Sequence, residues 1–236
     1  MTMISDILAE LEASADETRA QNASLFFKTG EGQYGYGDQF IGVTVPAQRA
    51  IAKKHKDASP EETKELLRSP WHEARLTALF ILVYSFQKGS TSQKAAIYDA
   101  YIKNKQYINN WDLVDSSAPY IVGEWLHGKS KDILIELAKS DSLWDRRIAI
   151  LATFYDIKHQ QPASALKIAD LLLHDNEDLI QKAVGWMLRE VGKRCDKSIL
   201  VDFLQSRYKT MPRTELRYAI EHFSPTERSA YLKGNV

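Results

Sequence analysis

The stretch "EARLTALF", residues 73–80, is the first of five segments in which a helical pattern returns at a nearly constant interval. The others are "WDLVDSSA" (111–118), "RRIAILAT" (146–153), "QKAVGWML" (181–188) and "ELRYAIEH" (215–222). Aligned, they place five residues in register, at steps of 36, 36, 35 and 35 residues: Arg75, Trp111, Arg147, Lys182 and Arg217. Such an interval is typical of one helix pair per repeat, as in HEAT-like solenoids, whose equivalent positions line a concave surface. A bundle of unrelated long helices would also carry cations at some common spacing, and that alternative stays open.

Start signals for helices recur along the chain, and alternating strand patterns are almost absent. Ser59-Pro60 with Glu62 and Ser224-Pro225 with Glu227 have the sequence of an N-cap, a proline at the first helical position and an acid at the third. We therefore predict an all-α fold, a HEAT-like helical repeat solenoid, with a single domain over residues 1–236 and the register clearest from about 70 to 222. We also predict helix starts at Ser69-Pro70 and Met211-Pro212, and helices over residues 146–157 and 169–188. The one candidate strand is "FIGVTV" at 40–45.

Composition indicates a globular protein, with 44% hydrophobic and 26% charged residues. The longest apolar run, residues 76–86, is too short to span a bilayer, and residues 1–17 lack the pattern of a signal peptide. We therefore expect a cytoplasmic protein without membrane association. The net charge of zero argues against a nucleic-acid partner on average. Residues 1–20 hold five acids and one arginine, however, which leaves cations elsewhere to form a basic face.

Familiar cofactor and metal motifs are not supported. "GEGQYG" at 30–35 has the glycine spacing of a dinucleotide loop, but no strand precedes it and no helix begins in it, so we interpret it as a loop between helices. The six histidines form no close ligand pair, and we expect neither a metal nor a cofactor. Cys195 follows Lys193-Arg194, which would favour a reactive thiolate, but an inert thiol near a helix end is the preferred interpretation.

The motif "WDLVD" at 111–115 has two interpretations. In the structural one, Trp111 packs in the core while Asp112 and Asp115 cap the helix or face solvent, and Asp112 fits this because a helix start favours negative charge. Asp115 fits less well, because a carboxylate in mid-helix is unfavourable and needs a partner when covered. In the functional interpretation, the register brings Asp115 and Trp186 together with Trp111, Arg147 and Lys182 in one groove. Gly185, also in mid-helix, indicates close approach of another helix or a ligand.

Three separated blocks, "WDLVDS…P" (111–119), "LWDRRIAIL" (143–151) and "IQKAVGWMLRE" (180–190), preceded by "FIGVTVPAQRAIAK" (40–53), resemble the DNA alkylation repair family of AlkD-like glycosylases. The similarity spans about residues 40 to 220. It implies a HEAT-like fold with a concave DNA-binding face, and excision of cationic N3- and N7-alkylated purines from duplex DNA. Asn110 departs from the pattern, since some members have a second aromatic residue there, and the neutral net charge is a second departure.

The resemblance implies roles for particular residues. Asp115 matches the catalytic carboxylate, Trp111 and Trp186 match two tryptophans that contact the sugar-phosphate, and Arg147 matches an arginine beside them. The register and its neighbours add predicted DNA contacts at Lys182, Arg189, Arg75 and Arg217. We expect a monomeric enzyme that acts on double-stranded DNA.

The chemistry agrees with a carboxylate that works alone. Alkylation at N3 or N7 makes the purine cationic, so the base leaves as a neutral molecule without a general acid. Asp115 would then stabilise an oxocarbenium-like sugar and orient water. No histidine lies near the motif blocks in the sequence, and Asp112 is expected to belong to a helix start. The alternative is a non-catalytic helical-repeat module that binds DNA structures or protein.

Overall fold

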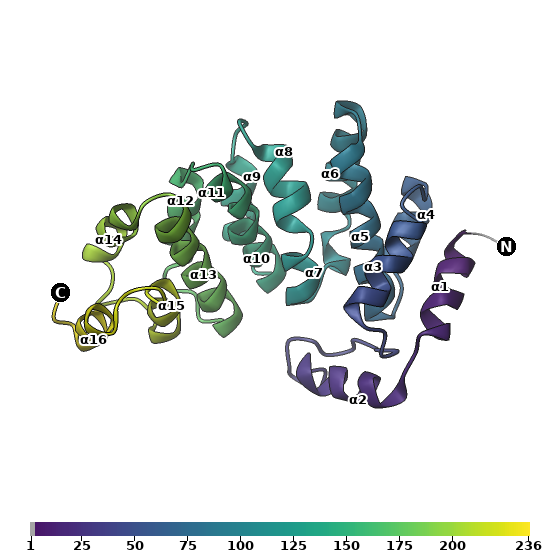
Figure 1. The fold of residues 1–236 in the computed structure, drawn as a ribbon, viewed down its shortest axis with the longest axis horizontal. Coiled ribbons are helices and arrows are strands. Elements are labelled where there is room, and N and C mark those ends of the chain that lie inside the picture. The colour runs from purple at the N-terminus through teal and green to yellow at the C-terminus, as the bar shows by residue number, and fades with distance from the viewer. Residues whose placement is uncertain (1–2) are drawn as a thin grey trace. The chain divides into compact units, whose positions relative to one another are not determined.

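The computed structural model describes residues 3–236, and its regular structure is helical (Figure 1). Over these residues the only β-type pairing is an isolated bridge between Gln39 and Trp71. No helix in the same range combines the length and the hydrophobicity needed to cross a bilayer. The chain divides into two compact units, the first ending at Ile121 and the second running over Val122–Val236. The all-α prediction is confirmed, whereas the single domain over 1–236 stays a prediction.

The first unit is built around α5 (His72–Lys88), whose residues 72–83 are buried without interruption. Helices from both sides of it in the sequence pack against it, which explains why it is buried nearly all round. The unit also holds a 3₁₀ turn at Lys105–Tyr107 and these helices: α1 (Met3–Ala13), α2 (Glu17–Phe26), α3 (Val45–Lys54), α4 (Pro60–Leu67), α6 (Thr91–Lys103) and α7 (Trp111–Asp115).

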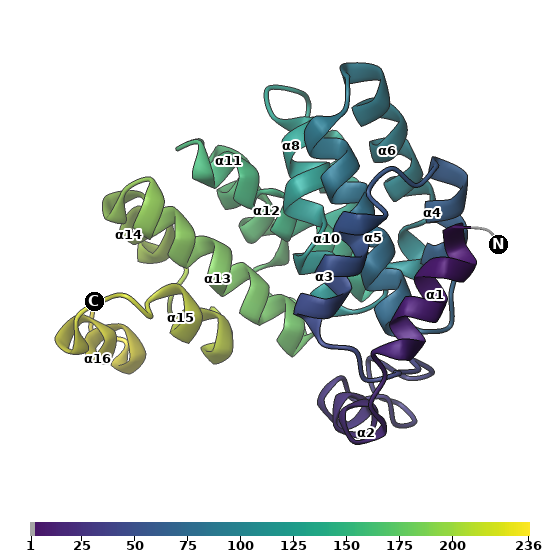
Figure 2. The ribbon, with the colours of Figure 1, turned by 45° about the vertical axis from the view of Figure 1, so that its right-hand side comes forward.

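The second unit is built around α13 (Asp178–Arg194), which packs most extensively against α15 (Arg213–Ala219) (Figure 2). It also contacts α10 (Leu143–Ala152), α12 (Ala163–Leu172) and α14 (Lys197–Gln205). A π-helical turn at Pro119–Gly123 crosses the boundary between the units along the chain. The other helices of this unit are α8 (Glu124–Leu126), α9 (Asp132–Ala138), α11 (Phe154–Lys158) and α16 (Pro225–Lys233).

The predicted helix starts are confirmed. At Ser59 the side chain accepts from the Glu62 amide while the Glu62 carboxylate accepts from the Ser59 amide, which is a complete capping box. Ser224 and Glu227 repeat this arrangement at the start of α16. The two further starts are confirmed to within two residues, since α5 begins at His72 and α15 at Arg213.

The strand predicted at 40–45 is wrong. Gly42 has a φ of 82° and Val45 already belongs to α3, and the amides of the segment meet a buried carboxylate rather than a neighbouring strand. The backbone N–H groups of Ile41, Gly42 and Val43 all donate to Glu73 of α5, at 2.8 to 3.3 Å. Because one ionised side chain satisfies three successive donors, the segment does not need the second strand that its alternating apolar pattern suggested.

Two predicted helices are each broken in the structure. The helix over 146–157 is interrupted at Thr153, whose hydroxyl donates to the Ile150 carbonyl at 2.6 Å and competes with the helical hydrogen bonds. The helix over 169–188 is interrupted between Leu172 and Asp178. There the carboxylate of Asp175 accepts from the Glu177 amide at 2.9 Å, the Asx-type turn that aspartate favours in loops.

The five register residues lie in five different helices: α5, α7, α10, α13 and α15. The helix predicted at 111–118 is shorter than its window, because α7 ends at Asp115. The Ser117 hydroxyl donates to the carbonyl of Leu113 at 2.5 Å, and Pro119 has no amide to continue the helix. Asp115 therefore occupies the last position of a helix rather than its middle, which corrects the sequence interpretation.

Gly185 marks the closest approach of two helices in the second unit. A Cβ atom at this position would lie 2.4 Å from the Glu215 carbonyl oxygen and 2.5 Å from Cβ of Tyr218, both on α15. The close neighbour is thus a helix, one of the two possibilities left by the sequence. Glu215 is fully buried here, and its carboxyl oxygens have no hydrogen-bond partner. Burial, with a smaller contribution from Asp175, raises the pKa of Glu215 to about 9, so the helix contact contains a neutral acid at pH 7.

We predict that Gly185→Ala lowers the free energy of unfolding by roughly 1–2 kcal/mol, because overpacking against the α15 backbone outweighs the gain of about 1 kcal/mol in helix propensity. Gly192→Ala, in the same helix, is the matched control. Its Cβ would meet the flexible end of the Leu200 side chain, at 2.7 Å, which can move aside. Urea denaturation followed by circular dichroism measures both variants. Equal stabilities for the two would contradict the close packing described here.

Candidate active site

The predicted site residues fall into two groups, one in each unit. Trp111 and Asp115 lie at the two ends of α7 in the first unit. Lys182, Trp186 and Arg189 lie on α13 in the second unit, which also contains Arg147 on α10 and Arg217 on α15.

Helix α7 has only five residues, and contacts made by side chains hold its conformation. Asn110 is fully buried and caps the first turn, its side-chain oxygen accepting from the Trp111 amide at 2.8 Å. Leu113 and Val114 are fully buried and anchor one face. Because Trp111 and Asp115 are four residues apart, they share the opposite, half-exposed face of the turn. This placement suits a pair that meets a ligand together.

Trp111 packs on aromatic residues that the sequence interpretation did not identify. Its ring stacks on Phe27 with centroids 5.3 Å apart and meets the edge of Phe26 at 5.8 Å. Phe27 stacks in turn on Phe40 at 5.0 Å. Phe26 is 65% exposed, so an apolar surface continues outward from the tryptophan. The signal that could have indicated it is the Phe26-Phe27 pair directly before the glycine-rich loop, where exposed aromatic residues are unusual.

Asp115 is half-buried, and its charge acts on the buried Tyr101 of α6. Burial raises the pKa of Tyr101, and the negative charge of Asp115 raises it further. The Tyr101 hydroxyl lies 2.9 Å from the hydroxyl of Ser117, two residues beyond Asp115. The end of α7 is therefore fixed to α6 by a buried polar contact.

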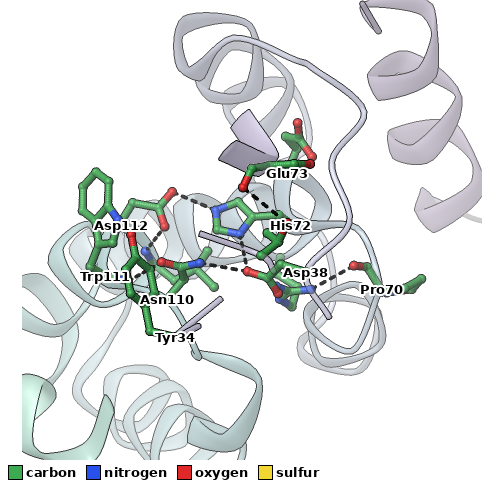
Figure 3. Close-up of polar contacts among 12 residues, drawn as sticks. Tyr34, Asp38, Pro70, His72, Glu73, Asn110, Trp111 and Asp112 are labelled. Carbon is green, nitrogen blue, oxygen red and sulfur yellow. Dashed lines mark hydrogen bonds and ion pairs between the residues drawn. The ribbon is translucent and has the colours of Figure 1, made fainter. Parts of the chain in front are cut away.

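The start of α7 is joined to α5 by a buried network centred on His72 (Figure 3). One imidazole nitrogen, Nε2, lies 2.8 Å from Asp112 of α7, and the other, Nδ1, lies 3.1 Å from Asp38 in the preceding loop. Asp38 also accepts from Arg75 at 2.5 Å and from Asn110 at 2.9 Å. Burial would lower the pKa of His72, but the charges and hydrogen bonds of the two aspartates outweigh it and raise the pKa to about 9.

This network corrects two interpretations of the sequence. A histidine does lie beside the motif block, although 40 residues separate His72 from Asp112. Asp112 belongs to the helix start, as predicted, but its carboxylate also pairs with His72 rather than only capping or facing solvent. No spacing rule links residues so far apart, so the partnership of Asp38, His72 and Asp112 could not be found from periodicity.

The partly exposed face of α13 carries Lys182, Trp186 and Arg189, at spacings of four and three residues. Lys182 pairs with Asp178 one turn earlier, at 2.6 Å, with both side chains largely open to solvent. Arg189 pairs with Glu221 and, at 3.4 Å, with Glu190. The Lys182–Asp178 pair is exposed and contributes little to stability, so Lys182 can exchange it for a stronger anionic partner. The Arg189 side chain is only 19% exposed, and its partner Glu190 is buried.

The remaining predicted cations differ in exposure. Arg147 is 5% exposed and donates to the Leu179 carbonyl in the first turn of α13 at 2.5 Å, which places its guanidinium beside the helix that carries Lys182. Arg217 is exposed. Arg75 is also 5% exposed, and its guanidinium donates to Asp38 and to the carbonyls of Ser69 and Pro70. These contacts tie Arg75 to the network around Asp38, and a phosphate contact at Arg75 stays a prediction.

Over residues 3–236 no group of three His, Cys, Asp or Glu side chains is close enough to hold a metal ion. Cys195 lies at the C-terminal end of α13, and burial raises the pKa of its thiol. This raised pKa argues against a reactive thiolate promoted by Lys193 and Arg194, and it supports the interpretation of Cys195 as an inert thiol.

The comparisons with known proteins address the family directly. The family model described as DNA alkylation repair enzyme matches residues 7–223. A solved structure described as a predicted DNA alkylation repair enzyme from Enterococcus faecalis is similar over 90% of this chain and 98% of its own, with a TM-score of 0.68 and 17% sequence identity, which shows a shared fold. No curated protein matches the chain in sequence. Since the family model covers nearly the whole length, the chain belongs to the DNA alkylation repair enzyme family.

Proposed function

We propose that the protein is a DNA glycosylase that removes positively charged N3- and N7-alkylated purines, such as 3-methyladenine and 7-methylguanine, from duplex DNA. It would hydrolyse the N-glycosidic bond as the first step of base excision repair. Membership of the alkylation repair family supports the pathway. The observation that carries the proposal is the shared half-exposed face of α7, where Trp111 and Asp115 are one helical turn apart.

The chemistry rests on one carboxylate. The lesion is already cationic, so cleavage releases a neutral base and leaves positive charge on the sugar. Asp115, held at the end of a turn with a buried anchor, would stabilise that charge electrostatically and orient the attacking water. The face of Trp111 would add attraction for the cationic sugar or base. The partial burial of Asp115 strengthens such an interaction, because water screens it less.

His72 does not supply the general acid that this mechanism lacks. Both of its ring nitrogens lie within hydrogen-bonding distance of carboxylates, and its side chain is 2% exposed. The imidazole therefore has no N–H directed toward a substrate.

Binding of the duplex would use cations on the second unit. Lys182, Arg189 and Arg217 are at least partly exposed and would contact phosphates, with Trp186 packing against the sugar-phosphate backbone. Such contacts position DNA without reading its sequence. Arg147 would act beside them, through its place next to the first turn of α13. We also propose that the enzyme works in the cytoplasm as a monomer, without metal or cofactor.

Base release tests the proposal and its mechanism together. Purified protein is incubated with matched duplexes that carry either 7-methylguanine or hypoxanthine at one position. We expect release of 7-methylguanine and none of hypoxanthine, because only the cationic lesion provides its own leaving-group activation. Comparable release of both bases would overturn the lone-carboxylate mechanism. Release of neither, with DNA binding retained, would favour the non-catalytic module.

We predict that Asp115→Asn lowers the rate of 7-methylguanine release by about 100-fold or more while the affinity for duplex DNA stays nearly unchanged, since the shape is kept and the charge is lost. The rate is measured under single-turnover conditions. Asp99→Asn, which removes one exposed carboxylate from α6 in the same unit, is the matched control and should keep the full rate. An active Asp115→Asn protein would remove Asp115 from the catalytic role.

We predict that Lys182→Ala weakens binding to any duplex sequence and reduces the slope of log Kd against log salt by about one unit, as expected for one lost phosphate contact. Lys167→Ala on α12 removes one exposed lysine from the same unit and is the control. Fluorescence anisotropy at several salt concentrations measures both slopes. If the two variants behave alike, the α13 face is not the phosphate-binding surface.

A further inference from the structure

In the buried network around His72, both nitrogens of the imidazole ring take part in polar contacts. Both ring nitrogens face carboxylate oxygens, at 3.1 Å on the Asp38 side and 2.8 Å on the Asp112 side. An ionised carboxylate only accepts hydrogen bonds, so each nitrogen must carry a proton to make both contacts. With both carboxylates ionised, the two contacts are made by an imidazolium.

The surroundings agree with a positive charge at His72. Two carboxylates, Asp38 and Asp112, are balanced by two cations, His72 and Arg75, so the buried cluster is neutral only when the imidazole is protonated. The ring also stacks on Phe40 at 4.6 Å and lies tilted against Phe27 at 4.9 Å, and aromatic faces attract cations.

The other groups around the ring are already engaged. Glu73, next to His72 on α5, accepts from the backbone amides of residues 41–43. Arg19 of α2 donates to the Gly42 carbonyl at 2.7 Å and pairs with Asp16. From α3, the side chain on this side is the uncharged Gln48, whose amide donates to the Val43 carbonyl. The charge of His72 is therefore matched by Asp38 and Asp112 rather than by these neighbours.

His72 is connected to Trp111 by two independent routes. One is the hydrogen bond to Asp112, the residue that follows Trp111 in α7. The other passes through Phe27, whose ring contacts both the imidazole and the indole. Asp38, the second partner of His72, also holds Asn110, which caps α7.

We propose that His72, as a buried imidazolium, is a positioning residue that fixes the orientation of α7 and so places Trp111 and Asp115 for the reaction. The inference rests on the proposed glycosylase function for its catalytic consequence. That His72 fixes the orientation of α7 does not depend on that function, because a helix of five residues is not stable without contacts to its surroundings. Loss of the proton would leave one of the two contacts of His72 without its hydrogen, and loss of the contact to Asp112 would release the start of α7 from α5.

The direct test uses the wild-type protein without DNA. We expect the His72 ring signals, followed by NMR, to stay in the protonated position through pH 7 and to titrate near pH 9, the value to which its partners raise the pKa. The indole N–H signal of Trp111, assigned by its loss in Trp111→Phe, should shift with the same midpoint. The stability contributed by this charge is complete below about pH 6.5 and is lost as the pH rises through 9. A ring that titrates near 6.5, or an indole signal that does not follow it, overturns the proposal.

The catalytic test compares two substitutions of paired histidines. His72→Gln should lower the single-turnover rate of 7-methylguanine release at pH 7 by roughly 10- to 100-fold with less than a threefold change in Kd for the duplex, because misplacement of reacting groups costs rate more than binding. It should also abolish the alkaline shift of the Trp111 signal. His55→Gln breaks a similar contact, 2.8 Å to Glu10 between α3 and α1, and should change neither.

The outcomes separate the two proposals. If the wild-type protein releases no base but His72 and Trp111 titrate together, the glycosylase function fails and the positioning of α7 by His72 stands. If His72→Gln is folded and keeps the full rate of release, the positioning role is wrong whatever the NMR titration shows.

Discussion

A helix of five residues makes too few backbone hydrogen bonds to be stable alone, and α7 therefore takes its conformation from the side chains around it. Its buried face is apolar, its end is tied to Tyr101 through Ser117, and its start is tied to α5 through His72 and Asp112. The candidate catalytic pair thus lies on a turn with little intrinsic stability but well-defined anchors. That is a favourable way to hold reactive groups, since the supporting contacts are made before any substrate binds.

Helix α13, in contrast to α7, is stabilised along its whole length by packing. It has 17 residues, a continuous buried face and a glycine that lets α15 approach closely. Its shape does not depend on any single polar contact, so its exposed face is free to carry cations in loose, solvent-screened pairs. The proposed roles follow this difference: precise placement of a carboxylate on α7, and adaptable contact with a backbone of phosphates on α13.

The sequence predicted what depends on local pattern. The helical class, both capping boxes and the close approach at Gly185 follow from propensity and from residue types that have few uses. The helix break at Thr153 could not be predicted, because the Thr153 hydroxyl can donate its hydrogen bond either to water or to a backbone carbonyl. The site divided in the same way. The proposal of Trp111 and Asp115 came from the register and from a resemblance. The partnership of His72 with Asp38 could not be predicted, because it exists only after α5, α7 and the loop have packed.

The carboxylate of Glu73 has a consequence for the association of the folded chain with other chains. The segment "FIGVTV" is apolar, rich in β-branched residues and without charge, which is the composition that favours intermolecular β-pairing. In the native state the amides of residues 41–43 are occupied by a buried side chain and not by another strand. Glu73 therefore acts as a gatekeeper. It keeps an aggregation-prone segment from presenting a free edge, and it does so with a residue that lies next to the central histidine of the site.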